Sequence, residues 1–145
     1  MDPKTRLLRS FEHTSFRLEL QRSYSVPAEA ERVSRFLAGD LTPPTDTPAA
    51  QAWFAQVAAQ AAEGKRIERV RVQEEPPTPY QRWERWYGHW NTEAGESIRY
   101  MTRQRAHEVG LLPAAGDDDW WLFDSCRLMV MRFDNEGRRI ETETV

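Results

Sequence analysis

The chain has 145 residues, of which 39% are hydrophobic, 11% aromatic and 30% charged, and its formal net charge is -3. No segment approaches the roughly 20 consecutive apolar residues of a membrane-spanning helix, and this aromatic content is too high for a disordered chain. The mild acidity argues against a surface built throughout to coat nucleic acid. We therefore expect one compact domain and no membrane partner.

The cysteine content and the N-terminus both bear on the cellular compartment. Cys126 is the only cysteine, so neither an intramolecular disulfide nor a multi-cysteine metal site can form. Residues 1–10 carry charges on both sides of a short apolar step and lack the apolar core of a secretory signal. These features predict a cytoplasmic protein.

The first predicted element is a strand. Residues 1–15 show no hydrophobic period, and we expect them to form a flexible N-terminal arm in front of a single domain over residues 16–145. Residues 16–20 alternate apolar and charged side chains, which is typical of a short strand with its apolar residues on one face.

Two helices follow, separated by a proline-rich loop at residues 40–46. The first is predicted for residues 27–39, because a proline opens this segment and a glycine closes it. The second is predicted for residues 47–64, which begin with a Thr-Pro cap and end with a glycine. Its alanine-rich interior can pack closely in the core.

A strand and an aromatic helix are predicted in the middle of the chain. Residues 65–72 are rich in β-branched side chains, but Ile67 falls on the face opposite Val70 and Val72. We therefore expect either a bulge or an interior strand covered on both faces. After a Thr-Pro cap, four aromatic residues follow at helical spacing along one stripe: Tyr80, Trp83, Tyr87 and Trp90.

The last third of the chain is predicted to be rich in strands. A loop with a short helical turn is expected at residues 104–119, and the final two strands form a hairpin whose loop ends in Gly137. Because strands cluster late and helices precede or interrupt them, we predict an α+β fold with a mostly antiparallel sheet of about five strands and helices packed on it. The late strand patterns cover residues 97–103, 120–123, 128–133 and 138–145.

Standard catalytic signatures are missing from the sequence. There is no glycine-rich phosphate loop, no dinucleotide-binding fingerprint and no serine flanked by glycines in a nucleophile elbow. The histidines are isolated, and none has a second histidine or a cysteine at metal-ligand spacing. We therefore assign no catalytic residue, no metal site and no cofactor.

The aromatic helix holds four candidate ligand-binding residues. Trp86 could stack on a base or a nucleotide, while Arg82, Arg85 and His89 could meet phosphate groups. The alternative is that the aromatic stripe packs on the sheet and the arginines reach into solvent. A buried Trp86 favours packing, whereas an exposed Trp86 in a basic groove favours binding.

Asp124 is the fifth candidate ligand-binding residue. It follows an apolar strand and could act as a general acid or base, with Glu84 or His89 as its partner. The alternative is that Asp124 caps the turn at the end of this strand.

Several segments resemble an actinobacterial family of small proteins of unknown function, often encoded beside helix-turn-helix regulators. The resemblance extends from about residue 16 to the end of the chain, and its most specific part is the motif Trp121-Leu122-Phe123-Asp124. It implies a regulatory role with a protein partner, for which a helix-turn-helix regulator is one candidate. The other segments that carry the resemblance are residues 16–19, 24–29, 36–39, 64–72 and 94–99.

The order of predicted elements also resembles half of a phospholipase D type domain, at the level of the fold alone. Such enzymes need a His-x-Lys motif to supply their nucleophile. Here His13, His89 and His107 are each followed by other residues. The resemblance therefore implies a non-catalytic relative.

These observations lead to three functional hypotheses. The leading one is a non-catalytic cytoplasmic regulatory or protein-interaction module. The first alternative is a nucleotide-binding or nucleic-acid-binding protein that uses the basic, aromatic middle region. The second alternative is an enzyme with an unfamiliar active site.

Overall fold

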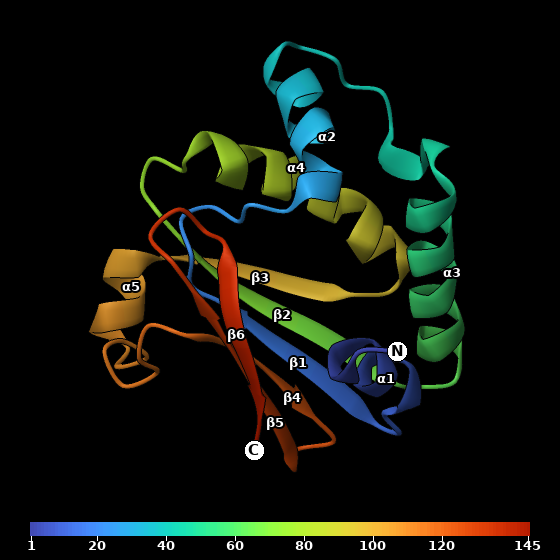
Figure 1. Cartoon of the computed structure of the whole chain (residues 1–145), viewed down its shortest axis with the longest axis vertical. Coiled ribbons are helices and arrows are strands. Elements are labelled where there is room, and N and C mark those ends of the chain that lie inside the picture. Colours follow the sequence, from blue (N-terminus) through green and yellow to red (C-terminus); the bar gives the residue numbers. More distant parts are fainter.

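A computed structural model describes all 145 residues and contains one six-stranded sheet with helices on both faces (Figure 1). The strand order across the sheet is β3-β2-β1-β4-β5-β6. The strands are β1 (Thr14–Glu19), β2 (Arg66–Gln73), β3 (Ser97–Thr102), β4 (Asp119–Phe123), β5 (Arg127–Phe133) and β6 (Arg139–Thr144).

The α+β class is confirmed, but the sheet is mixed rather than mostly antiparallel, and it has six strands rather than about five. β1, β2 and β3 run parallel to one another, whereas β1 pairs with β4, β4 with β5 and β5 with β6 in antiparallel fashion. The parallel half arises because helical crossovers join β1 to β2 and β2 to β3, which returns the chain to the same end of the sheet each time. The antiparallel half consists of the hairpins β4–β5 and β5–β6, and β4 pairs antiparallel with β1 after the chain returns from β3 through α5.

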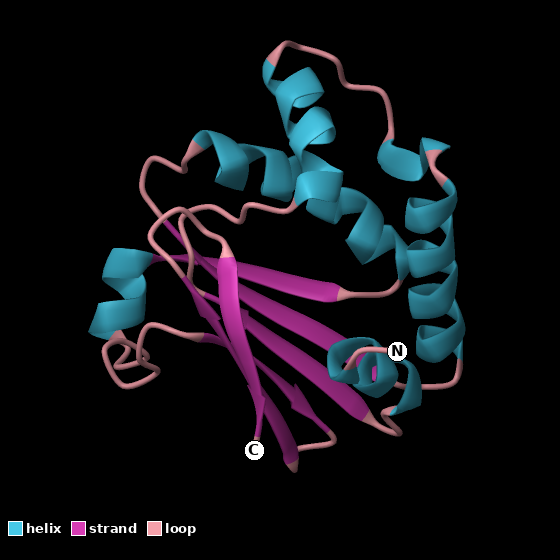
Figure 2. Cartoon of the chain, viewed as in Figure 1, coloured by secondary structure: helices cyan, strands magenta, loops and turns pink.

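Five α-helices and one short 3-10 turn complete the fold (Figure 2). Two predicted caps are confirmed, since Thr47 Oγ1 accepts the N–H of Ala50 and Thr78 Oγ1 accepts the N–H of Gln81. A proline follows each cap, at a position where its missing N–H removes no helical hydrogen bond. The helices are α1 (Pro3–Ser10), α2 (Pro27–Leu37), α3 (Pro48–Ala62), α4 (Pro79–Ala94) and α5 (Arg103–Glu108), and the 3-10 turn is Pro44–Asp46.

The N-terminal residues form a packed helix, where the sequence predicts a flexible arm. Asp2 caps α1, and Leu7 and Phe11 lie in the hydrophobic core. Gln60 Nε2 of α3 donates a hydrogen bond to the carbonyl of Leu8 at 2.9 Å, which fastens α1 to the domain. Two core residues in so short a segment give no visible period, so the pattern alone cannot reveal this helix.

The two faces of the sheet bury different apolar clusters. The α5 face is covered by α5 and the loop after it, and its cluster consists of Leu18, Leu20, Val72, Ala106 and Leu112. The α4 face is covered by α1, α3 and α4, and its cluster consists of Leu7, Phe11, Val57, Ile67, Trp121, Phe123, Met129 and Met131.

β2 is an interior strand covered on both faces, which confirms one of the two interpretations of its uneven pattern. It pairs with β1 on one side and β3 on the other, without a register shift. Val70 and Val72 pack in the α5 face, whereas Ile67 packs in the α4 face. Because parallel interior strands are buried on both faces, the arginines that alternate with these valines also lie inside the protein.

Candidate ligand-binding cavity

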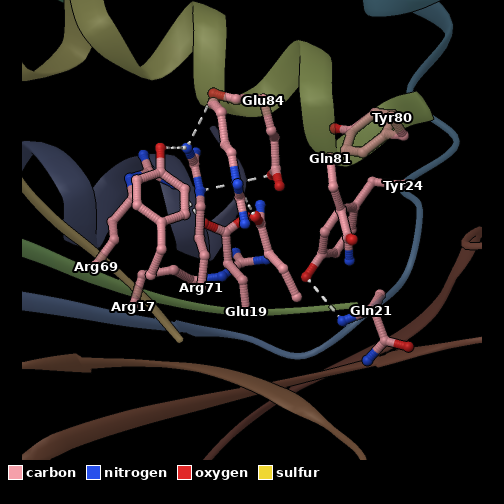
Figure 3. Close-up of polar contacts among 12 residues, drawn as sticks. Arg17, Glu19, Gln21, Tyr24, Arg69, Arg71, Tyr80, Gln81 and Glu84 are labelled. Carbon is pink, nitrogen blue, oxygen red and sulfur yellow. Dashed lines mark hydrogen bonds and ion pairs between the residues drawn. The ribbon is translucent and has the colours of Figure 1, made fainter. Parts of the chain in front are cut away.

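Charged side chains of the two central strands meet beneath the helices. The register pairs Arg17 of β1 with Arg69 of β2, and Glu19 with Arg71. These side chains lie on the α4 face (Figure 3), and each is only 6% to 12% exposed. Isolated charges are costly to bury, so each of them requires a partner of opposite charge or a set of hydrogen bonds.

Two of the arginines are paired with glutamates. Arg71 Nε donates to Glu19 Oε2 at 2.7 Å and lies 3.6 Å from Glu84 Oε2. Arg69 Nε donates to Glu96 Oε1 at 2.6 Å. These charge-assisted bonds fix the direction of both guanidinium groups.

Asp119 holds the third arginine. Its carboxylate accepts hydrogen bonds from Arg17 Nη2 at 2.7 Å, from the Tyr24 hydroxyl at 2.5 Å and from the Leu20 N–H at 2.9 Å. The guanidinium of Arg17 also lies 5.3 Å from the centre of the Trp121 ring. Asp119 is fully buried, so its removal would leave buried Arg17 without the carboxylate that accepts its hydrogen bond, and with Glu19 as its remaining counter-charge.

Glu84 is a buried carboxyl that keeps its proton near neutral pH. Burial raises its pKa to about 8, and the nearby charge of Glu19 adds to this effect. Burial also opposes ionisation of Glu19, but the three surrounding arginines outweigh it and hold the pKa of Glu19 far below its usual range. The two carboxyl groups share a hydrogen bond, which protonated Glu84 donates and ionised Glu19 accepts.

Gly88 allows α4 to approach the sheet closely. A Cβ at this position would lie 2.8 Å from the Tyr100 hydroxyl and 3.1 Å from Arg71 Nη1. Glycine costs about 1 kcal/mol relative to alanine in a helix interior. Here it permits a contact in which Arg71 Nη1 donates to the backbone carbonyl of Glu84 at 3.3 Å.

A cavity of about 650 Å³ lies between these charged strands and α4. This volume is within the range of small-molecule sites, which is roughly 300–1,000 Å³. Further walls come from α1, α3, the segment that leads into α2, and the turn between β5 and β6. The wall that α4 contributes consists of Tyr80, Trp83, Glu84, Tyr87 and Asn91.

Four basic residues line one end of the cavity. Lys4 of α1 and Arg139 of β6 join Arg17 and Arg69 there, and we call these four residues the cationic cluster. Burial lowers the pKa of Lys4, and repulsion from the three arginines lowers it further. No carboxylate forms an ion pair with Lys4. A second cavity of about 450 Å³ shares Lys4, Arg17 and Arg69 with the first, so the cluster lies where the two cavities meet.

Three buried side chains that line the cavity each keep one polar atom without a hydrogen-bond partner. These atoms are Arg17 Nε, Trp83 Nε1 and Asn91 Oδ1, and each side chain belongs to a residue at most 8% exposed. Buried polar groups almost always have a partner in folded proteins. The three atoms therefore mark positions at which a bound molecule could form hydrogen bonds.

Four of the five candidate residues from the sequence lie on α4 but outside the cavity. Trp86 is half-buried, and its ring centre lies 5.1 Å from that of Phe36. Arg85 Nε donates to Gln73 Oε1 at 2.5 Å. The structure therefore does not bring the ring and the basic groups into one groove, and ligand binding at these residues stays a prediction. The exposed members of this set are Arg82, Arg85 and His89.

Asp124, the fifth candidate, also lies outside the cavity. Its carboxylate accepts hydrogen bonds from the N–H groups of Glu12, His13 and Thr14 at 2.9, 2.6 and 3.0 Å. Desolvation opposes ionisation, but these backbone bonds outweigh it and lower the pKa of Asp124. Asp124 thus holds the connection between α1 and β1, whereas Glu84, the partner that the sequence suggests for it, lines the cavity.

The charged residues of β1 and β2 do not stand out in the sequence. Their alternation with apolar residues is typical of a strand with one solvated face, so Arg17, Glu19, Arg69 and Arg71 look like surface residues. The signal that could have revealed them is the helix predicted on each side of β2. Helical crossovers imply parallel strands covered on both faces, and the charged positions are then buried.

Comparison with known proteins places the chain in a family. A family model described as a domain of unknown function (DUF6879) matches residues 2–145. The chain belongs to this family. No curated protein and no solved structure matches the chain significantly. Because the DUF6879 match begins before α1, it includes Lys4 and every other residue that lines the cavity.

Two further findings describe this DUF6879 domain. None of its helices combines the length and the hydropathy that crossing a membrane requires. Its His, Cys, Asp and Glu side chains form no group of three that could hold a metal ion.

Proposed function

We propose that the protein is a non-catalytic binding module whose cavity takes up a small organic anion. The observation that carries this proposal is the cationic cluster, in which Lys4 and Arg139 line the cavity beside the ion-paired Arg17 and Arg69, and Lys4 forms no ion pair with a carboxylate. A carboxylate or phosphate at this position would offset the repulsion that now lowers the pKa of Lys4. Guanidinium groups suit this task because they bind planar or tetrahedral oxyanions through two parallel hydrogen bonds.

The rings that line the cavity suit a ligand with a flat apolar part. Trp53 of α3 borders both cavities beside the cationic cluster. Trp83 and Tyr87 of α4 and Phe133 of β5 lie along the remaining walls. Aromatic walls with a few well-placed polar groups are typical of small-molecule sites. We expect an aromatic acid or an aryl phosphate to fit better than an inorganic anion.

This proposal keeps the regulatory role that the sequence suggests and adds a ligand to it. It differs from the nucleic-acid alternative, because the anion site lies in a cavity and not on exposed Arg82 and Arg85. A protein partner and a cytoplasmic location remain part of the proposal, since a small binding module needs another molecule to transmit its state.

Thermal unfolding in the presence of anions tests the proposal. The probes are benzoate, phenyl phosphate and adenosine monophosphate, each titrated against the wild type, Lys4→Gln and Arg6→Gln. Arg6 is the matched control, because it lies in α1, is exposed and does not line either cavity. A ligand that binds the folded state at 100 times its Kd adds about 2.7 kcal/mol of stability.

We expect at least one probe to raise the Tm of the wild type by several degrees. Lys4→Gln should weaken that binding about tenfold, because it removes one charge-assisted hydrogen bond, whereas Arg6→Gln should leave it unchanged. The proposal fails if no probe stabilises the wild type, or if Lys4→Gln and Arg6→Gln bind the probe equally well.

A further inference from the structure

Acidic and hydroxyl groups gather in the cavity away from the cationic cluster. The Tyr80 hydroxyl donates to Glu29 Oε1 at 2.9 Å, and Glu84 lies one helical turn along α4 from Tyr80. In Figure 3 the side chains of Arg17 and Arg69 lie at one side of the view, Tyr80 lies at the other, and Glu84 projects from α4 between them. The cavity is therefore polar at both ends but opposite in character.

The carboxyl groups at this acidic end are only weakly neutralised by the protein. Arg71 Nε lies 3.6 Å from Glu84 but 2.7 Å from Glu19, so its charge is already engaged. Glu29 accepts a hydrogen bond from Tyr80 and forms no ion pair. Burial raises the pKa of Glu29 as it does that of Glu84. A positively charged group placed here would stabilise the ionised form of both carboxyl groups.

We propose that the ligand is a zwitterion, with its anionic group bound by the cationic cluster and an ammonium group bound by Glu84 and Glu29. This inference rests on the proposed function, since it names the ligand class of the same cavity. It adds that the ligand must carry two opposite charges, one for each of two poles: the cationic cluster and the pair of Glu84 and Glu29.

The spacing of the two poles limits the ligand further. Glu19 lies between the two poles, because it is 3.7 Å from Arg69 Nη1 and shares a hydrogen bond with Glu84. The ligand must therefore carry its two charges far enough apart to reach past this carboxylate. An aromatic acid with an aminoalkyl arm at the far side of the ring meets this requirement and places its ring against the aromatic walls.

Binding of such a ligand has a consequence for protons. Glu84 holds its proton in the free protein and faces Glu19 of β1, Arg69 and Arg71 of β2, and Tyr24, while Tyr80 is close to both Glu84 and Glu29 of α2. When the ammonium group arrives, Glu84 ionises and its proton passes to the solvent. Uptake of a zwitterion near pH 7 therefore releases up to one proton, whereas uptake of a plain anion at the cationic cluster does not.

Calorimetry with three matched compounds tests this inference. The compounds are para-(aminoethyl)benzoate, which has both charges, para-ethylbenzoate, which has only the anion, and phenethylamine, which has only the cation. Each is titrated near pH 7 in two buffers of different ionisation enthalpy, so that released protons can be counted. The proteins are the wild type, Glu84→Gln and the matched control Glu93→Gln, since Glu93 is an exposed residue of the same helix.

We expect the wild type and Glu93→Gln to bind the aminoethyl compound at least tenfold more tightly than para-ethylbenzoate, with proton release. In Glu84→Gln this ratio should fall below about threefold and the proton release should disappear. If Glu84→Gln does not fold, the zwitterion assignment is tested by the wild type alone, through its preference for the aminoethyl compound over para-ethylbenzoate and its proton release.

Other outcomes separate this inference from the proposed function. If para-ethylbenzoate binds as well as the zwitterion, or if no proton is released, the zwitterion assignment is wrong while the anion site stands. If neither benzoate binds, the zwitterion assignment is also wrong, and the comparison of Lys4→Gln with Arg6→Gln on phenyl phosphate decides the anion site independently.

Discussion

The two faces of the central strands follow the same alternating pattern but are built in opposite ways. On the α5 face, β1 and β2 contribute Leu18 and Val72 to a continuous apolar core. On the α4 face, the neighbouring positions Arg17 and Arg71 enter a network of ion pairs beside a cavity. Alternation along a strand thus shows which residues share a face, but it does not show which face meets solvent.

The ion-pair network on the α4 face should contribute as much to stability as the apolar core on the α5 face. Of the substitutions that test this, Asp119→Ala should have the largest effect. The variant leaves Arg17, the Tyr24 hydroxyl and the Leu20 N–H without their common acceptor. Breaking a buried ion pair by removing one partner costs about 3–5 kcal/mol. We expect urea unfolding to show a loss of this size. The control Asp118→Ala removes a half-exposed carboxylate and should cost less than about 1 kcal/mol; equal losses would refute the special role of Asp119.

Leu18→Ala probes the apolar face at the same strand. Leu18 is 1% exposed, and truncation of a buried leucine costs about 2–5 kcal/mol through lost burial and the cavity left behind. We expect a loss of about 3 kcal/mol in urea unfolding, with ligand affinity unchanged once the variant is folded. A change in affinity as large as that of Lys4→Gln would show that the two faces are not independent.

Glu84→Gln should change how stability depends on pH. The pKa of Glu84 in the folded protein, about 8, lies above its ordinary value of 4.5, so the folded state holds a proton that the unfolded state loses between these values. This contribution to stability is complete below pH 4.5 and is lost as the pH rises through 8. Glutamine mimics the protonated acid and does not titrate, so the free energy of unfolding of the variant should depend less on pH between 4.5 and 8.

The difference should be clearest at alkaline pH. At about pH 8.5 we expect Glu84→Gln to be more stable than the wild type by at least about 1 kcal/mol, since one pKa unit corresponds to 1.36 kcal/mol. Thermal unfolding of both proteins across the pH range measures this. Parallel pH profiles for the two proteins would contradict protonation of Glu84 in the folded state.

Arg82→Gln should have the smallest effect. Arg82 lies on the same helix as Glu84 but is exposed and forms no ion pair. Surface substitutions of this kind usually change stability by less than about 0.5 kcal/mol. We expect neither the Tm nor the affinity for phenyl phosphate to change. A tenfold loss of affinity would instead move the anion site to the outer side of α4.

Much of the fold can be predicted from local signals. The ends of α3 and α4 are predicted to within about two residues. Their starts follow from the Thr-Pro caps at Thr47 and Thr78, and their ends from the glycine after each helix. The parallel pairing of β1, β2 and β3 could not be predicted in the same way, because it depends on where the crossover helices return the chain. The helix α1 is also missed, since its place depends on contacts such as that of Leu7 with the distant core.

The candidate site is harder to predict than the fold. Its arginines lie on strands 52 residues apart in the sequence, and only the register of β1 with β2 brings Arg17 beside Arg69. Lys4 comes from a segment with no visible period. The aromatic stripe of α4 is visible in the sequence, and Trp83 and Tyr87 of this stripe line the cavity together with Glu84. The sequence favours Arg82 and Trp86 instead, because basic and aromatic residues are adjacent there.

The three hydrogen bonds of Asp124 tie together two parts of the molecule that are distant in sequence. The same carboxylate ends β4 and holds the backbone just after α1, while Lys4 sits at the other end of that helix. The turn between β4 and β5, where Cys126 is exposed, is thus hydrogen-bonded to the segment that follows α1, the helix that carries Lys4. A label on Cys126 would therefore report on the position of α1 from outside the cavity.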